Sequence, residues 1–147
     1  MEPNSPEKPG PFPPTAGGAR PLRILVVDDE PSVLHIIEQH LTADGHEVHT
    51  APNGILALER FVGEAWDLVL TDRVMPGMNG DELAEAIKRI DRSMPVVLVT
   101  AFAERPPDPE REQSPFDLTI RKPFTRETLR AALNFVAGRT VSPRRAA

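Results

Sequence analysis

Acidic, hydroxyl and lysine side chains stand at the ends of several short apolar segments of this chain of 147 residues. The residues in question are Asp28, Asp29, Asp72, Thr100 and Lys122. A lone acidic residue after a strand is more often a helix cap than a ligand. The joint occurrence of three carboxylates, a hydroxyl and a lysine is what indicates a functional site.

These residue types favour phosphoryl transfer with a bound Mg²⁺ ion. Three neighbouring carboxylates repel one another, and some would take up a proton unless a cation lies among them. Oxygen ligands without His or Cys favour a hard cation. A carboxylate can also attack phosphorus to form an aspartyl phosphate, while a nearby lysine balances the charge of the transferred group. Phosphoryl transfer chiefly requires such positioning and charge neutralisation.

The apolar pattern around these residues predicts strands that alternate with helices. Short β-branched runs such as residues 22–27 and 96–100 are typical of strands buried on both faces. Apolar residues between the runs recur at spacings of three and four, which predicts helices. This alternation favours an α/β fold with helices on both faces of a parallel sheet. Ligands of such sheets bind beyond the carboxyl ends of the strands, where the candidate residues stand.

The predicted element boundaries follow from turn and cap residues. The predicted strands cover residues 22–27, 46–51, 67–72, 96–100 and 118–120. Pro31 suits the first position of a helix, and Asn53 and Thr125 can cap two later helices. Gly138 is predicted to end the last helix, because glycine commonly follows a helix terminus.

Four segments resemble the receiver domain of bacterial two-component response regulators, and they occur in the family's order. They read VVDDE (26–30), DRVMPGMNG (72–80), VTA (99–101) and KPF (122–124). The resemblance extends from about residue 22 to residue 138. It implies a doubly wound, five-stranded parallel sheet of strand order 2-1-3-4-5. It also implies a phosphorylation-dependent signalling switch rather than an enzyme with a substrate of its own.

The resemblance assigns a phosphoacceptor and a metal site. Asp72 would accept the phosphoryl group, and Asp29 and Asp72 would bind Mg²⁺ directly. The backbone carbonyl of Val74 would be a third protein ligand, and Asp28 would act largely through water. The phosphoryl donor would be a phosphohistidine on a histidine kinase or a histidine phosphotransfer protein, and the downstream protein is not identified.

The resemblance also assigns roles to Thr100 and Lys122. Thr100 would be the hydroxyl that moves toward the phosphoryl group, and Lys122 would contact the phosphoryl oxygens. The family's usual cis bond between Lys122 and Pro123 would orient that lysine. Three residues before the lysine the family usually has Tyr or Phe, whereas this chain has Thr119. Nearby Phe102 or Phe116 could substitute for the missing ring.

Two further departures from the family concern the fourth helix and the phosphoryl lifetime. Residues 104–115 contain four prolines and no other apolar residue. Because proline inside a helix costs about 3 kcal/mol or more, we expect largely irregular structure there, with a short helix over residues 109–113 as the alternative. Val74 and Phe102 are apolar where an attacking water would be positioned, so we expect a long-lived phosphoprotein.

Composition and charge predict the domain boundaries, the class of partner and the location of the protein. Seven of the 17 prolines fall in residues 1–21, so residues 1–20 are predicted to form a disordered tail, 21–138 the domain and 139–147 a basic flexible tail. The net charge of −5 combines −8 in residues 21–138 with +3 in residues 139–147, and so acidic a domain argues against direct DNA binding. The absence of cysteine and of any long apolar run predicts a cytoplasmic protein without a membrane span.

Two other functions remain open at this stage. One is a receiver-like interaction module that works without phosphorylation. The other is an aspartate-nucleophile phosphatase, which would need a second carboxylate two residues after Asp72, where Val74 stands. The four histidines are expected to be surface or partly buried residues rather than zinc ligands.

Overall fold

Five parallel strands form one sheet in the computed structural model, which describes residues 21–101 and 114–139. The strands are β1 (Arg23–Val27), β2 (Glu47–Ala51), β3 (Leu68–Thr71), β4 (Val96–Thr100) and β5 (Leu118–Arg121). They pair in the order β2-β1-β3-β4-β5, and every pair is parallel. The predicted α/β fold and strand order are therefore confirmed, with strand ends that differ from the prediction by one residue.

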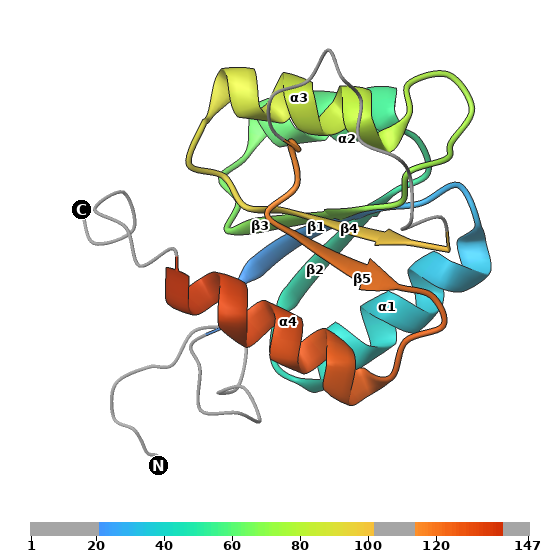
Figure 1. Ribbon diagram of the computed structural model, residues 1–147, viewed down its shortest axis with the longest axis vertical. Coiled ribbons are helices and arrows are strands. Elements are labelled where there is room, and N and C mark those ends of the chain that lie inside the picture. The colour runs from blue at the N-terminus through green and yellow to red at the C-terminus, as the bar shows by residue number, and fades with distance from the viewer. Residues whose placement is uncertain (1–20, 102–113, 140–147) are drawn as a thin grey trace.

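Helices cover both faces of this sheet in the described residues. They are α1 (Pro31–Ala43), α2 (Gly54–Gly63), α3 (Gly80–Ile90) and α4 (Arg126–Arg139). Figure 1 shows α2 and α3 on one face and α1 and α4 on the other. Successive side chains of a strand point to opposite faces, so a strand buried on both sides must be apolar at every position.

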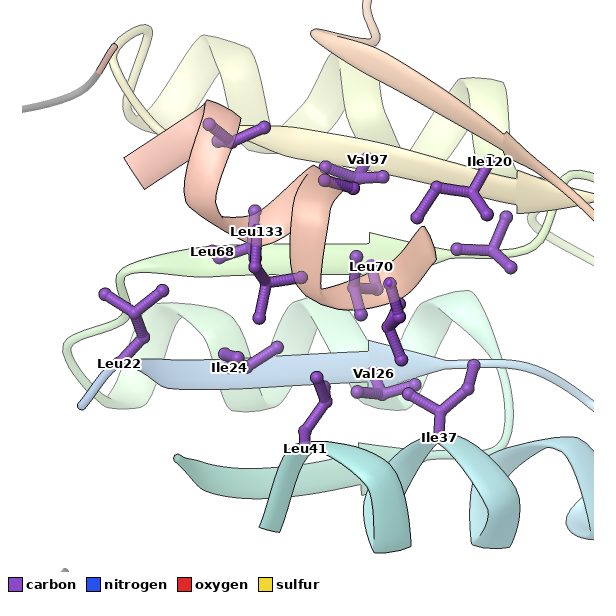
Figure 2. Close-up of a cluster of buried hydrophobic side chains, with 14 residues drawn as sticks. Leu22, Ile24, Val26, Ile37, Leu41, Leu68, Leu70, Val97, Ile120 and Leu133 are labelled. Carbon is purple, nitrogen blue, oxygen red and sulfur yellow. The ribbon is translucent and has the colours of Figure 1, made fainter. Parts of the chain in front are cut away.

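Each face has its own hydrophobic core. Ile24 and Val26 of β1 point into the core beneath α1 and α4, which Figure 2 shows with Leu41 and Leu133 from the two helices. Leu25 and Val27 point the other way, into the core beneath α2 and α3. The continuous apolar run of β1 thus supplies both cores.

The helix starts follow the predicted caps. Pro31 occupies the first turn of α1, and the Asn53 side chain accepts a hydrogen bond of 2.8 Å from the backbone N–H of Leu56. Thr125 Oγ1 accepts the backbone N–H of Thr128 at 3.0 Å. The prediction that Gly138 ends the last helix is wrong, because α4 runs on to Arg139. Gly138 lacks the positive φ of a helix-terminating glycine, and glycine costs a helix only about 1 kcal/mol.

The segment between β4 and β5 contains no helix in its described residues, which are Ala101 and residues 114–117. The prediction of irregular structure over residues 104–115 falls almost wholly on residues 102–113, outside the described part of the chain. The two predicted tails also lie outside it, except for Arg139. Within the described residues, no helix is long and apolar enough to cross a membrane.

Trp66 lies two residues before β3, at the amino-terminal edge of the sheet. It is the only tryptophan of the chain, which has no tyrosine, and its side chain is buried. The Arg23 guanidinium lies 4.8 Å from the centre of its ring, and the His49 ring meets it edge-on at 5.3 Å. Trp66 therefore belongs to the end of the molecule opposite the carboxyl ends of the strands.

Candidate functional site

Asp28 and Asp72 lie side by side because they follow neighbouring strands. Val27 of β1 is paired with Thr71 of β3, and each strand continues directly into its aspartate. The backbone N–H of Asp72 donates to the carbonyl of Val27 at 3.0 Å, which extends the sheet by one more hydrogen bond. The backbone pairing therefore fixes the distance between these two carboxylates before their side chains interact.

Three carboxylates gather at this edge of the sheet. Oxygen atoms of Asp28, Asp29 and Asp72 all lie within 4.8 Å of one another. Asp28 and Asp72 are buried, whereas Asp29 is exposed on the loop that leads into α1. This is the grouping that the strand ends of the sequence predict.

Lys122 joins the group from the end of β5. Its Nζ atom donates a hydrogen bond of 3.0 Å to Oδ2 of Asp28 and lies 3.6 Å from Oδ2 of Asp72. The backbone N–H of Lys122 donates to the carbonyl of Thr100 at 3.1 Å, so β4 holds the lysine in place. The bond between Lys122 and Pro123 is cis, as the resemblance implies.

Burial and charge shift the pKa values of this pair. Burial raises the pKa of Asp28 above its usual range, although the Glu30 N–H and the Lys122 ammonium act in the opposite direction. Burial alone would lower the pKa of Lys122, but its hydrogen bond to Asp28 and the charges of Asp28 and Asp72 raise it above the usual value. Lys122 is therefore a permanent cation at neutral pH.

The loop after Asp72 holds the phosphoacceptor candidate in a fixed orientation. The backbone N–H of Arg73 donates to Oδ1 of Asp72 at 2.8 Å, and the Thr71 hydroxyl donates to the Asp72 carbonyl at 2.9 Å. Gly80 closes this loop so tightly that a Cβ atom there would lie 2.1 Å from the Asp72 carbonyl oxygen. Only glycine fits this position without a displacement of the Asp72 backbone.

The other candidate residues occupy different environments. Thr100 ends β4 and is fully buried, while Val74 is 56% exposed on the loop after β3. Thr119 has an exposed side chain in the middle of β5. Phe116 is half-buried just before β5, and Phe102 lies outside the described residues.

Arg73 and Asp81 form an ion pair beside the site, and the sequence does not predict this contact. Arg73 Nη1 lies 3.1 Å from both carboxylate oxygens of Asp81, and the side chains of both residues are only 12% exposed. Arg73 belongs to the DRVMPGMNG motif, but the resemblance assigns no role to its charge. Only the fold brings it to the first turn of α3.

The donor set suits a hard divalent cation. All three clustered groups are carboxylates, which are ligands that Mg²⁺ prefers, and no His or Cys lies among them. Asp29 is exposed, so an ion there would retain part of its water shell, as Mg²⁺ usually does. Lys122 offsets part of the negative charge and stands where the oxygens of a transferred phosphoryl group would also be in reach.

Comparison with known proteins gives a family for this arrangement. The family model of the response regulator receiver domain matches residues 24–134. The sporulation initiation phosphotransferase F of Bacillus subtilis (strain 168) is 32% identical over 111 residues, which cover 76% of this chain and 90% of that protein. The transcriptional regulatory protein GlrR of Escherichia coli (strain K12) is 31% identical over 115 residues, 78% of this chain but only 26% of that protein.

Solved structures agree with the sequence comparison. The response regulator TrrA of Thermotoga maritima, solved with Mg²⁺ and a beryllium fluoride, superimposes with a TM-score of 0.71 at 32% identity. The match covers 78% of this chain and 98% of TrrA. TrrA has also been solved in complex with the histidine kinase ThkA, and that copy matches with a TM-score of 0.68.

Proposed function

This chain belongs to the family of response regulator receiver domains, and we propose that it receives its phosphoryl group on Asp72. The observation that carries the proposal is the position of the Asp72 carboxylate, beside two further aspartates and 3.6 Å from the Lys122 ammonium. Phosphoryl transfer requires a positioned nucleophile and neutralised charge, and this edge of the sheet supplies both.

The proposed reaction moves the phosphoryl group from a phosphohistidine to an aspartate. The phosphorus–nitrogen bond of the donor breaks, one Asp72 carboxylate oxygen bonds to phosphorus, and the donor imidazole leaves. Asp28, Asp29, Asp72 and the Val74 carbonyl would hold Mg²⁺, which when bound supplies positive charge to the phosphoryl oxygens. Lys122, already charged, would bind the same oxygens from β5, and Thr100 would approach them from the end of β4.

The proposed donor is a histidine kinase or a histidine phosphotransfer protein. The support is that TrrA, a response regulator of the same fold, forms a complex with a histidine kinase. The output would pass to another protein by direct contact. The chain matches only about a quarter of GlrR, so the function of the rest of that longer protein is no guide to the function of this chain.

A phosphodonor experiment tests the assignment of Asp72. We expect the full chain, incubated with Mg²⁺ and acetyl phosphate, to gain one phosphoryl group that is stable in acid and labile in base, as measured by intact-mass spectrometry. Asp72→Asn should abolish the adduct, and chelation of Mg²⁺ should suppress it. Glu38→Gln, at an exposed position of α1, is the matched control and should leave the adduct unchanged.

The same experiment decides between the proposal and its alternatives. No adduct with any small phosphodonor would favour an interaction module that works without phosphorylation, which the exposed Thr119 in place of an aromatic residue keeps open. Rapid turnover would favour a phosphatase, although exposed Val74 offers no carboxylate two residues after Asp72. We expect neither, because an apolar Val74 positions an attacking water poorly and the adduct should persist.

A further inference from the structure

Arg73 is held rigidly on the side of Asp72 that faces α3. Its guanidinium is paired with Asp81 at 3.1 Å, and both side chains are 12% exposed. A buried ion pair has a well-defined geometry, because separation of the partners leaves an unpaired charge in the interior. Arg73 and Asp81 therefore connect the residue after the phosphoacceptor to the first turn of α3.

The same guanidinium also contacts the chain that enters β5. The central carbon of Arg73 lies 5.6 Å from the centre of the Phe116 ring, within the range of a cation–π interaction. The next residue, Asp117, receives hydrogen bonds from the Val96 N–H at 2.9 Å and from Lys88 Nζ at 2.8 Å. Asp117 is thus anchored to β4 and α3, whereas the contact of Phe116 reaches toward the phosphoacceptor loop.

Phosphorylation of Asp72 changes the carboxyl group to which the Arg73 backbone N–H donates. The Arg73 N–H donates to the Asp72 carboxylate at 2.8 Å, and hydrogen bonds to an ionised acceptor are about twice as strong as neutral ones. An acyl phosphate removes the charge from that carboxyl group and adds about −1.5 to −2 on the phosphoryl oxygens. The tight fit of Gly80 against the Asp72 carbonyl leaves the backbone of the two residues little room to absorb the change.

We propose that Arg73 is a positioning residue that couples the phosphorylation state of Asp72 to the ring of Phe116. The proposal rests on the proposed function of Asp72. It assigns the read-out to the half-buried Phe116 rather than to Thr119, whose side chain is exposed on β5. In this proposal, phosphorylation changes the surface formed by the residues just before β5.

A fluorescent reporter at position 116 tests the coupling directly. We expect the full chain with Phe116→Trp to change its emission when Mg²⁺ and beryllofluoride are added together. The wild type, whose single tryptophan lies at the edge of the sheet opposite Asp72, should not. Arg73→Gln in the reporter background should abolish the response while beryllofluoride still binds, as measured by calorimetry, and Arg73→Lys should restore part of it.

Reciprocity gives a second test that needs no reporter. If beryllofluoride bound at Asp72 alters the free energy of the Arg73–Phe116 contact, loss of the Phe116 ring must alter the affinity for beryllofluoride by the corresponding factor. Phe116→Leu should change the affinity by at least about fivefold, whereas Phe116→Tyr, which keeps the ring, should not. In the Arg73→Gln background, Phe116→Leu should have no further effect.

The outcomes separate this inference from the proposed function. A wild type that forms no acetyl phosphate adduct and binds no beryllofluoride overturns both. Normal binding with a silent reporter, or with a response that persists in Arg73→Gln, overturns only the role of Arg73 and Phe116. If Phe116→Trp fails to fold, the amide resonance of Phe116 in the wild type and in Arg73→Gln gives the same decision.

Discussion

Lys122 is the residue on which the charge balance of the site depends. It is the one cation described in contact with the cluster, bonded to Asp28 at 3.0 Å and close to Asp72 at 3.6 Å. Its raised pKa keeps the ammonium charged at neutral pH. The lysine therefore stabilises buried Asp28, and under the proposed function it would also bind phosphoryl oxygens.

Replacement of Lys122 should lower reactivity more than stability. We expect Lys122→Gln to slow the appearance of the acetyl phosphate adduct on the order of 100-fold, the usual effect of losing one donor to a developing charge. Lys88→Gln, which removes a lysine from the opposite end of α3, serves as the control for loss of a partly buried ammonium. Equal adduct rates in wild type and Lys122→Gln would refute the role.

His46 makes the stability of the protein sensitive to mild acid. Its Nδ1 atom accepts the backbone N–H of Leu22 at 3.0 Å, and burial lowers its pKa below the ordinary 6.5. As the pH falls through 6.5, the unfolded chain binds a proton that the folded protein does not. Stability that is present above this pH is therefore lost below it.

We expect the free energy of unfolding to fall between about pH 7.5 and 5.5, by at most about 1.4 kcal/mol per pH unit, the limit for one proton. His46→Asn, which keeps an acceptor for the Leu22 N–H but cannot titrate, should flatten this dependence. His35→Asn, at an exposed position, should retain it. Urea titrations at several pH values give the comparison, and identical slopes in wild type and His46→Asn would contradict it.

At the scale of elements, the start of α3 determines the shape of the loop that follows Asp72. Asn79 and Glu82 form a reciprocal capping box, which fixes where the helix begins. The Gly80 N–H then donates to the Arg73 carbonyl at 2.8 Å, so the first turn of α3 lies directly against residues 72 and 73. A change in this turn must therefore affect the orientation of Asp72.

Gly80→Ala should accordingly be costly. Its Cβ would meet the Asp72 carbonyl oxygen at 2.1 Å and the Cα of Arg73 at 2.9 Å. We expect a loss of stability of about 1–3 kcal/mol, as for other overpacked positions, together with slower phosphorylation. Gly63→Ala is the control, because nothing lies within 4 Å of its added methyl group, and it should be neutral or slightly stabilising. Denaturant unfolding of both variants measures the difference.

The sequence predicts those features of the site that arise from the sheet. Because parallel strands all end at the same edge, the residues after β1, β3 and β5 must meet, and the structure does bring Asp28, Asp72 and Lys122 together. The apolar runs predict strands well because strands buried on both faces have no polar positions. Local capping preferences, and not the sheet, placed Asn53 and Thr125 at helix starts.

The contacts of Arg73 could not be predicted in this way. Arg73 and Asp81 stand on different elements, eight residues apart, and no helical or strand period joins them. Their pairing depends on how α3 packs on the sheet, as does the contact with Phe116, 43 positions away in the chain. The end of α4 was mispredicted for a different reason. Glycine is a purely local indication of a helix end, and here the helix continues past Gly138.

At the scale of the whole molecule, the hydrophobic cores determine what is needed for folding. The two clusters extend along the chain from Leu22 to Val136 and draw on all five strands and all four described helices. The family model matches residues 24–134, almost the same interval. The buried residues of both described cores therefore lie within residues 22–136.

A chain restricted to residues 21–139 should thus fold and react like the full protein. We expect its melting temperature to change by less than about 4 °C, equivalent to about 1 kcal/mol, and its acetyl phosphate adduct to form at the same rate. Calorimetry and mass spectrometry make the two measurements. A truncated chain that melts far lower would show that the terminal segments contribute to stability.

The burial of Trp66 allows the intrinsic fluorescence of the protein to report on its folding. With one tryptophan and no tyrosine, all long-wavelength fluorescence comes from a ring enclosed by Arg23, His49 and the core beneath α2 and α3. That ring lies at the edge of the sheet opposite Asp72. Its emission should therefore show whether a variant is folded and should not change on phosphorylation. Loss of structure can then be distinguished from loss of signalling in one sample.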